Sequence, residues 1–291
     1  MRNYKKIIQL VSLLAVVSAI LIIVAAWQAR AQESLEINFF NVGHGDAIFI
    51  RTPNDQRILI DGGLGNQVIQ KLGQRLPFFD RRIDVVILTH PHPDHITGLI
   101  SVIKRYQIGK IFYTNVKTQE ELFTIFKNES LAKNIPLIKV DKITSQDLVG
   151  EVVLNFLYPD HDLNQEIIEE KDINNTSIVF KLIYKKSSFL FVGDAGEEEE
   201  KGLIASGQNL KADVLKIGHH GSNTSSSQEF TQAVSPQFAV ITCGENYNLS
   251  HPSLRVIRRL ERVGAKIYRT DQAGDIKIST SGNGQYRIKT D

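Results

Sequence analysis

The sequence predicts a mixed α/β (α+β) domain in which two β-sheets pack face to face with helices outside, behind an N-terminal apolar helix. Residues 7–27 contain no charged side chain, and from residue 35 onward short β-like runs alternate with helical runs. The first three β-like runs follow one another closely, as strands do in antiparallel hairpins. This last observation argues against the rival arrangement, a doubly wound parallel sheet.

The N-terminal segment is long enough to cross a membrane. A basic start, MRNYKK, precedes the uncharged residues 7–27, which as a helix would extend over about 31 Å. This run is longer than the apolar core of a cleavable signal peptide, although an acceptable A-x-A cleavage pattern ends at Ala31. We therefore expect residues 1–33 to be a signal anchor, with a signal peptide cleaved after Ala31 as the alternative. In both cases the basic flank predicts that the rest of the chain lies outside the cytoplasm.

Residues 34–291 fit one large domain of ordinary composition. Lys and Arg number 34 against 32 Asp and Glu, so the net charge of +2 gives no bulk signal for polyanion binding. The single cysteine, Cys243, excludes an intrachain disulfide and a cysteine-based zinc site. Its place in the apolar run FAVITC predicts a buried thiol.

Strands and helices alternate along the rest of the chain. Predicted strands are LEINFF, DAIFIRT, RILID, IDVVILT, KIFYT, VVLNFLY, SIVFKLIY, SFLFVG, ADVLKIG, QFAVITC, AKIYRT, DIKIST and QYRIKT. Helical spacing predicts helices in GNQVIQKLGQRL, ITGLISVIKRY and TQEELFTIFKNESLAKN, then from Glu197 and near residues 226–234 and 253–263. Both halves thus mix strands with helices, as two packed sheets require.

Residues 89–98, THPHPDHITG, concentrate possible metal ligands. Within six positions they hold His90, His92, Asp94 and His95, in a chain with eight histidines. Two prolines fix the backbone φ between the histidines and reduce the entropy lost when the side chains converge. Imidazole and carboxylate groups are ligands of Zn²⁺ and Mn²⁺. The loop therefore predicts a metal site.

The pattern H-x-H-x-D-H after a strand resembles the signature of the metallo-β-lactamase superfamily. This resemblance implies a four-layer αββα sandwich with one or two divalent metal ions at the sheet edges. RILIDGG and FLFVGDAG supply two further aspartates of the signature, Asp61 and Asp194, and DVLKIGHHGS supplies its late histidine as His219 or His220. In the superfamily the first aspartate supports a ligand histidine and the second bridges the metals. Alone, Asp61 would also fit a turn and Asp194 a helix N-cap.

The resemblance implies two ligand sets. Metal 1 would be held by His90, His92, Asp194 and water, and metal 2 by Asp94, His95, Asp194 and His219. Of the two adjacent histidines we favour His219 as the ligand, with His220 orienting substrate or donating a proton.

One histidine of most two-metal members is missing from this chain. In its place, before the strand that leads to Asp194, the sequence reads KDINNTSIVF. His161 is an alternative ligand, although it comes early in the chain. Without a replacement, metal 1 is weakly held, and the loss of a nitrogen ligand makes Mn²⁺ as suitable as Zn²⁺.

Other residues are candidates for catalysis or substrate binding. The candidate catalytic residues are Asp94, His220 and His251, and the candidate substrate contacts are Asn175, Ser177 and Lys216. His251 fits a proton donor and a structural loop histidine equally well, and Asn175 and Ser177 would also close a turn.

Two charged helical segments have simpler interpretations. Arg255, Arg259 and Arg262 share one helix face, for which a solvated surface is favoured over a phosphate site. Residues 197–200 form an acidic first helical turn, which the helix dipole favours, and we assign them no function.

Within the superfamily, the chain resembles the extracellular metallo-β-lactamase-like domain of the ComEC family of DNA-uptake competence proteins. The motifs are FFNVGHGDAIFI, N-N-x-S, K-x-G-H-H-G-S, SHPSLRVIRRL and YRTDQAGDIKI, and the resemblance covers about residues 36–280. That group opens with D-V-G-Q-G-D-A, so Asn41 and His44 are departures. The channel segment of the competence proteins has no counterpart here, so DNA transport by this chain alone is not expected.

The resemblance implies an extracytoplasmic metal-dependent phosphodiesterase that cleaves DNA as a nuclease. A second hypothesis is a hydrolase of envelope phosphodiesters, such as choline- or glycerol-phosphate groups. A third is a metal-poor module that binds DNA or a partner without cleaving it. β-Lactamase activity is not favoured, because the resemblance is to a different branch.

Overall fold

The computed structural model describes residues 2–30, 34–142, 144–149, 152–165, 168–244 and 251–291. The α-helices are α1 (Arg2–Arg30), α2 (Gln67–Arg75), α3 (Pro93–Arg105), α4 (Glu121–Ala132), α5 (Glu197–Ala205), α6 (Gln228–Val234), α7 (Leu254–Arg262) and α8 (Thr270–Ala273). The strands are β1 (Leu35–Phe39), β2 (Ile48–Arg51), β3 (Arg57–Ile60), β4 (Arg82–Ile87), β5 (Gln107–Tyr113), β6 (Leu137–Lys139), β7 (Thr144–Val149), β8 (Val152–Tyr158), β9 (Val179–Tyr184), β10 (Ser187–Phe191), β11 (Val214–Lys216), β12 (Phe238–Ile241), β13 (Lys266–Arg269), β14 (Ile276–Thr280) and β15 (Arg287–Thr290). The 3₁₀ segments are η1 (Leu163–Gln165), η2 (Glu170–Thr176) and η3 (Gly218–Gly221).

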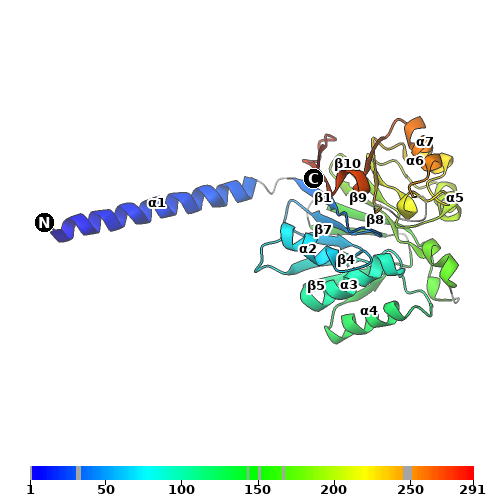
Figure 1. Ribbon diagram of the computed structural model, residues 1–291, viewed down its shortest axis with the longest axis horizontal. Helices are drawn as coiled ribbons and strands as arrows, with labels where there is room; N and C mark the ends of the chain where they lie inside the picture. The colour runs from blue at the N-terminus through cyan, green and yellow to red at the C-terminus, as the bar shows by residue number, and fades with distance from the viewer. Residues whose placement is uncertain (1, 31–33, 143, 150–151, 166–167, 245–250) are drawn as a thin grey trace.

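The strands form two sheets that face each other. The first has eight strands in the order β15-β14-β1-β2-β3-β4-β5-β6, and the second has seven in the order β13-β12-β11-β10-β9-β8-β7. Helices α2, α3 and α4 pack on the outer face of the first sheet, and α5, α6 and α7 on the outer face of the second (Figure 1). This is the four-layer αββα sandwich that the sequence predicts.

Alternation along the strands supplies the apolar layers. In β2, Ile48 and Ile50 join the cluster between the sheets, whereas Phe49 joins the cluster beneath α2–α4. In β3, Ile58 lies between the sheets and Leu59 beneath the helices. Because successive side chains of a strand point to opposite faces, a single apolar run serves two core layers.

The strand directions bring several loops to one edge of the domain. In the first sheet, β1 and β3 are both antiparallel to β2, and β3 is parallel to β4, so these three strands end at the same edge. In the second sheet, β10 to β13 are parallel to one another. The loops after these strands carry most of the chemistry described below.

The predicted strands are present, and Cys243 is buried as predicted, with 2% of its surface exposed. The sequence patterns missed β6 and β7. Both lie at sheet edges, where β6 has three residues with little burial and β7 reads TSQDLV. An edge strand needs apolar side chains less than a central one, so its sequence carries a weaker signal.

One helix, among the residues that the structure describes, is long and apolar enough to cross a membrane. The qualifying part of α1, Tyr4–Ile22, has a mean hydropathy of 2.0 and is not buried. A membrane anchor and a signal sequence would both look like this, so anchoring and cleavage stay predictions.

The acidic start of α5 holds the second sheet's helices together. The Arg259 guanidinium lies 3.2 Å from Glu197 Oε1 and donates to the carbonyl oxygens of Ser225 and Ser226. Arg259 therefore joins α7 to α5 and to the loop before α6. Neither a phosphate site nor a purely solvated helix face describes this arginine.

Glu200 predicts a pH-dependent stability. Its carboxylate is buried and accepts hydrogen bonds from the backbone N–H groups of Ser226 and Ser227, and burial raises its pKa to about 7. The ordinary pKa of the group is 4.5. Between these values the folded state holds the extra proton, so the free energy of unfolding falls as pH rises, by about 3 kcal/mol at most. We expect Glu200→Gln to remove this decline when urea unfolding is compared at pH 5 and pH 8. An unchanged decline in the variant would contradict the assignment.

Candidate metal centre

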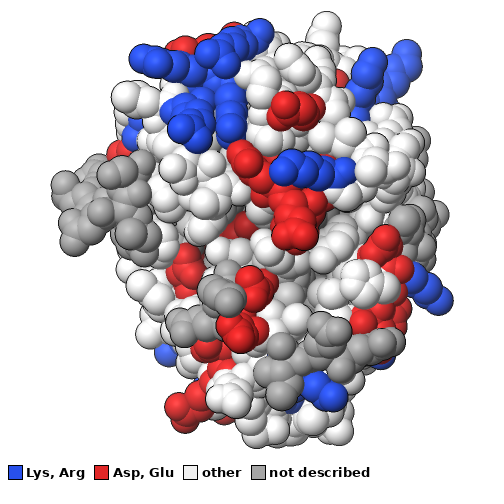
Figure 2. All heavy atoms as spheres, turned by 90° about the vertical axis from the view of Figure 1, so that its right-hand side faces the viewer, with Lys and Arg blue, Asp and Glu red and all other residues white. Residues whose placement is uncertain are grey.

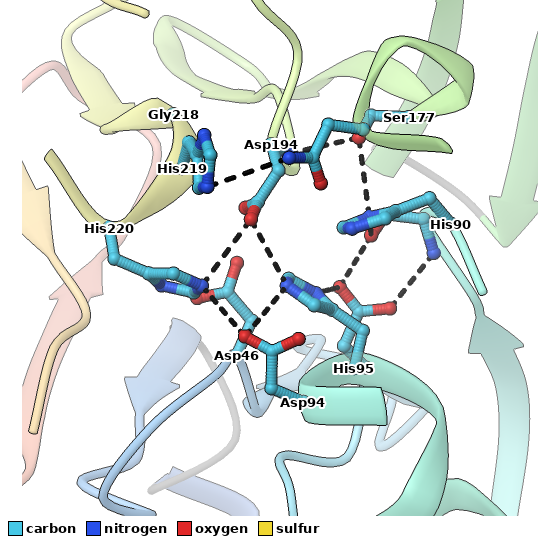
Figure 3. Close-up of polar contacts among 12 residues, drawn as sticks. Asp46, His90, Asp94, His95, Ser177, Asp194, Gly218, His219 and His220 are labelled. Atoms are coloured by element: carbon cyan, nitrogen blue, oxygen red, sulfur yellow. Dashed lines mark hydrogen bonds and ion pairs between the residues drawn. The ribbon is translucent and has the colours of Figure 1, made fainter. Parts of the chain in front are cut away.

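Acidic and histidine side chains converge at the carboxyl edge of the two sheets (Figure 3). Asp61 follows β3, His90 follows β4, and Asp94 and His95 lie in the first turn of α3. Asp194 follows β10 and His220 lies in η3 after β11. The chain thus reaches one point from both sheets.

Four atoms surround the position expected for metal 2. His220 Nε2 lies 3.3 Å from Asp94 Oδ2 and 3.4 Å from Asp194 Oδ2. His95 Nε2 lies 3.8 Å and 3.4 Å from the same two oxygens. Ligand atoms of a tetrahedral ion with bonds of about 2.1 Å are separated by about 3.4 Å. The four histidine-to-carboxylate distances are close to this separation.

The histidines are oriented as metal ligands are. His95 Nδ1 lies 2.8 Å from Asp61 Oδ2, as predicted for a supporting aspartate, and His220 Nδ1 donates to the carbonyl oxygen of Thr242 at 2.9 Å. The Nε2 atoms of His90, His95 and His220 are buried and have no hydrogen-bond partner among the described residues. A ligand histidine uses one ring nitrogen for such a support and presents the other to the metal.

The electrostatic field of the centre favours a cation. Burial alone would lower the pKa of His95 and His220. The carboxylates of Asp194 and its neighbours instead raise the pKa of His95 well above its ordinary value and that of His220 to about 10. A potential that attracts a proton this strongly also attracts a divalent ion.

Fewer protein atoms define the position expected for metal 1. His90 forms a compact group with His95 and Asp194, and Asp194 Oδ1 is buried without a hydrogen-bond partner among the described residues. The His92 ring lies 4.9 Å from that of His90 between centroids and is partly exposed, but among the described residues His92 belongs to no compact metal-type group. At the place of the missing histidine, Asn174 Oδ1 is buried and also lacks a partner among the described residues.

His220, and not His219, has the geometry of a ligand. Both residues have a positive φ, 46° for His219 and 52° for His220, so the turn sends their neighbouring side chains in different directions. His219 Nδ1 lies 3.2 Å from Thr224 Oγ1, and its Nε2 lies 3.5 Å from Asn174 Nδ2. The geometry therefore favours His220 over His219, the residue that the sequence analysis preferred, as the ligand.

Lys216 does not face a substrate. Its ammonium group is 1% exposed and lies 2.6 Å from Asp46 Oδ2. The predicted phosphate contact was wrong, because β11 points this side chain into the interior.

The two other candidate histidines, His161 and His251, have different surroundings. His161 is exposed, bonded to Asp160 at 2.7 Å, and belongs to no compact metal-type group of described residues. The His251 ring lies 5.6 Å from the His219 ring, and burial lowers its pKa to about 4.

The two candidate substrate residues near η2, Asn175 and Ser177, also make contacts within the protein. Ser177 is buried, its Oγ accepts from the backbone N–H of Asp194 at 3.0 Å, and it lies 3.3 Å from His90 Nδ1. The Asn175 carbonyl oxygen accepts from the Tyr158 hydroxyl at 3.0 Å.

Asp46 and His44 join the centre although sequence reasoning did not select them. Asp46 is 2% exposed, and His44 Nε2 lies 2.8 Å from Asp94 Oδ2. In the sequence, NVGHGDA stood out only as a family motif. The segment follows β1, and Asp61 follows β3, which is parallel to β1, so both are placed at the same edge of the sheet.

Residues 40–245 match the family model of the metallo-beta-lactamase superfamily, and the chain belongs to that superfamily. It is thus a metal-dependent hydrolase by fold, with candidate His and Asp clusters for divalent ions. Among curated proteins it is similar to "ComE operon protein 3" of Bacillus subtilis (strain 168), 29% identical over 275 residues, covering 87% of this chain and 33% of that protein. It is 28% identical over 259 residues to "Competence protein ComA" of Neisseria gonorrhoeae, covering 88% of this chain and 34% of that protein. The chain spans about a third of the length of these relatives.

Two further proteins are similar to this chain, one over a shorter part of the sequence and one in fold alone. "Exodeoxyribonuclease WalJ" of Streptococcus pneumoniae serotype 2 is 22% identical over 180 residues, covering 60% of this chain and 59% of that protein. The crystal structure of the metallo-beta-lactamase fold protein YhfI from Bacillus subtilis has a TM-score of 0.56 at 12% identity, covering 84% of this chain and 100% of that one. This structural likeness agrees with the αββα sandwich.

Proposed function

We propose that this protein is an extracytoplasmic phosphodiesterase that cleaves DNA with two divalent ions, Zn²⁺ or Mn²⁺, and is held at the membrane by α1. The observation that carries the proposal is the set of four atoms around metal 2, with the buried Nε2 atoms of His95 and His220 directed at one point. The resemblance to the ComEC family and the similarity to an exodeoxyribonuclease support DNA as the substrate.

When bound, such ions lower the pKa of a water molecule towards neutrality and neutralise charge on a phosphate. Asp194 would be shared by both positions, and Asp61 lies 2.8 Å from His95 Nδ1 and would orient this histidine as a ligand. The rings of His219 and His251 lie 5.6 Å apart, and in this proposal they would contact the substrate or its leaving group.

The distribution of charge on the exposed face at this edge is also compatible with a second class of substrate. Figure 2 shows Lys and Arg gathered along its upper edge and Asp and Glu through its middle, within the described part of that face. A long DNA duplex needs many phosphate contacts, whereas a small envelope phosphodiester needs few. A small phosphodiester is therefore the alternative substrate.

The test uses the full chain in detergent, with metal content from elemental mass spectrometry. Plasmid DNA, single-stranded DNA and glycerophosphocholine are each incubated with Mn²⁺ or Zn²⁺. DNA cleavage by the wild type, lost in a His92→Ala variant, is the expected result. Cleavage of glycerophosphocholine alone would move the assignment to the envelope substrates. A purified protein that contains almost no metal and cleaves none of these substrates would instead support the third hypothesis, a binding module.

A further inference from the structure

His44 lies at the metal centre and has no counterpart in the superfamily signature. It occupies the loop between β1 and β2, at the position of glutamine in the D-V-G-Q-G-D-A motif. His44 forms a compact group with Asp94 and His220, two of the residues around the position of metal 2.

The backbone fixes His44 at this place. Gly45 has a φ of 97°, and a Cβ atom there would lie 1.8 Å from the Asp94 carbonyl oxygen. On the other side, a Cβ atom on Gly244 would lie 2.8 Å from the carbonyl carbon of Gly43. The loop therefore packs directly on the backbone of Asp94, and the His44 side chain is about one-sixth exposed, at 16%.

We propose that His44 is a positioning residue whose Nε2–H donates a hydrogen bond to Asp94 Oδ2 and so holds this carboxylate towards metal 2. The inference rests on the metal-dependent function proposed above. The 2.8 Å separation is that of a charge-assisted hydrogen bond. Imidazole and a primary amide share an N–H donor, which accounts for either histidine or glutamine at this position.

The test is a Co²⁺ titration of the full chain in detergent, followed by visible absorption, for the wild type, His44→Ala and His44→Gln. We expect His44→Ala to weaken one bound ion by about 10- to 100-fold, as loss of a supporting hydrogen bond does. His44→Gln should retain both the affinity and the spectrum. His161→Gln, the same change at an exposed histidine, controls for surface binding and should match the wild type.

Each contrary outcome has a distinct meaning. An affinity of His44→Gln as low as that of His44→Ala, with an altered Co²⁺ spectrum, would make His44 a ligand and overturn the positioning role. Wild-type affinity in His44→Ala would overturn any role at the metal. A wild type that binds no Co²⁺ would overturn the proposed function together with this inference.

A second inference concerns the opposite edge of the domain, where two aromatic side chains are exposed. Phe78 and Phe79, in the loop between α2 and β4, are 89% and 77% exposed, with ring centroids 5.4 Å apart. Phe78 lines a hollow together with Arg81 and Arg105. Asp80 also lines it, but its carboxylate lies 2.7 Å from the Arg57 guanidinium, whose positive charge balances it. Exposed apolar groups gathered with basic ones mark an interaction surface.

The topology places this pair at the edge where the chain enters the domain. The loop precedes β4, and β1, which runs in the same direction, lies three strands away, about 15 Å. Five residue steps separate Arg30, the end of α1, from Leu35, and they can span at most about 18 Å. If α1 crosses a bilayer, this edge of the domain must lie close to its surface.

We infer that Phe78 and Phe79 dock the domain on the membrane, with the rings among the lipid headgroups and the arginines beside lipid phosphates. This inference rests on the anchoring by α1 proposed above. In this orientation the metal centre, at the opposite edge, faces away from the bilayer and is open to an exported polymer.

Tryptophan quenching by brominated lipids tests this orientation in the full chain. The chain, with Trp27→Phe throughout, is reconstituted into vesicles of phosphatidylcholine and phosphatidylglycerol. Phe79→Trp probes the loop, Leu14→Trp probes α1, and Leu254→Trp is the control, because Leu254 is 74% exposed at the start of α7 near the metal edge. We expect strong quenching in the first two variants and none in the third.

Quenching in Leu14→Trp without quenching in Phe79→Trp would overturn the docking and leave the anchor intact. No quenching in Leu14→Trp would overturn the anchor and the docking together. Equal quenching in Leu254→Trp and Phe79→Trp would overturn the orientation.

Discussion

Replacing Asp194 with asparagine is expected to empty both metal positions and abolish hydrolysis. Asp194 Oδ2 lies 3.4 Å from the Nε2 atoms of His95 and His220, and Asp194 also forms a compact group with His90 and His95. The amide removes the negative charge and presents one oxygen instead of two. Loss of several kcal/mol of transition-state stabilisation corresponds to a decrease in kcat/KM of ~10³-fold or more.

The measurement pairs elemental mass spectrometry with DNA cleavage in Mn²⁺. Asp160→Asn is the matched control, because Asp160 is exposed, its carboxylate lies 2.7 Å from His161 Nδ1, and it is far in sequence from the metal loop. The control should keep wild-type metal content and activity. Retention of two metals by Asp194→Asn would contradict the bridging position assigned to this carboxylate.

The strand ends made much of the centre predictable. His90, Asp61 and Asp194 each follow an apolar run that is readable as a buried strand. Parallel strands deliver the residues after them to one edge, so a correct strand assignment also predicts which side chains meet. The sandwich followed from the same runs, since closely spaced strands at the start predict hairpins.

Adjacent residues were harder to distinguish. His219 and His220 are neighbours in a turn where both have a positive φ, and only coordinates reveal that His220 Nδ1 reaches the Thr242 carbonyl oxygen while His219 turns to Thr224. Likewise Lys216 belongs to a fully buried strand, so alternation gives no polar face to place it on. Its partner, Asp46, is 170 positions away (216 − 46), beyond the reach of any local pattern.

Replacing Lys216 with methionine is expected to destabilise the fold by about 3–5 kcal/mol, because the buried Asp46 carboxylate would lose its cation. The two groups are 1% and 2% exposed and 2.6 Å apart. Burial alone would raise the pKa of Asp46, but Lys216 and His220 hold it below its ordinary value, so the carboxylate stays charged in the interior. Thr242 also donates its hydroxyl to Asp46, a contact that cannot replace the lost charge.

Urea unfolding of metal-free protein measures this effect apart from any contribution of bound ions. Lys277→Met is the matched control, since Lys277 pairs with Glu36 at the surface, where both side chains are more than a quarter exposed, and such pairs contribute up to about 1 kcal/mol. An Asp46→Asn/Lys216→Met double variant should recover part of the lost stability, because it leaves no unpaired buried charge. If Lys216→Met lost no more stability than Lys277→Met, groups other than Lys216 would be stabilising the buried Asp46 carboxylate. The loop that carries His44 would then be held chiefly by its glycine contacts with the Asp94 backbone.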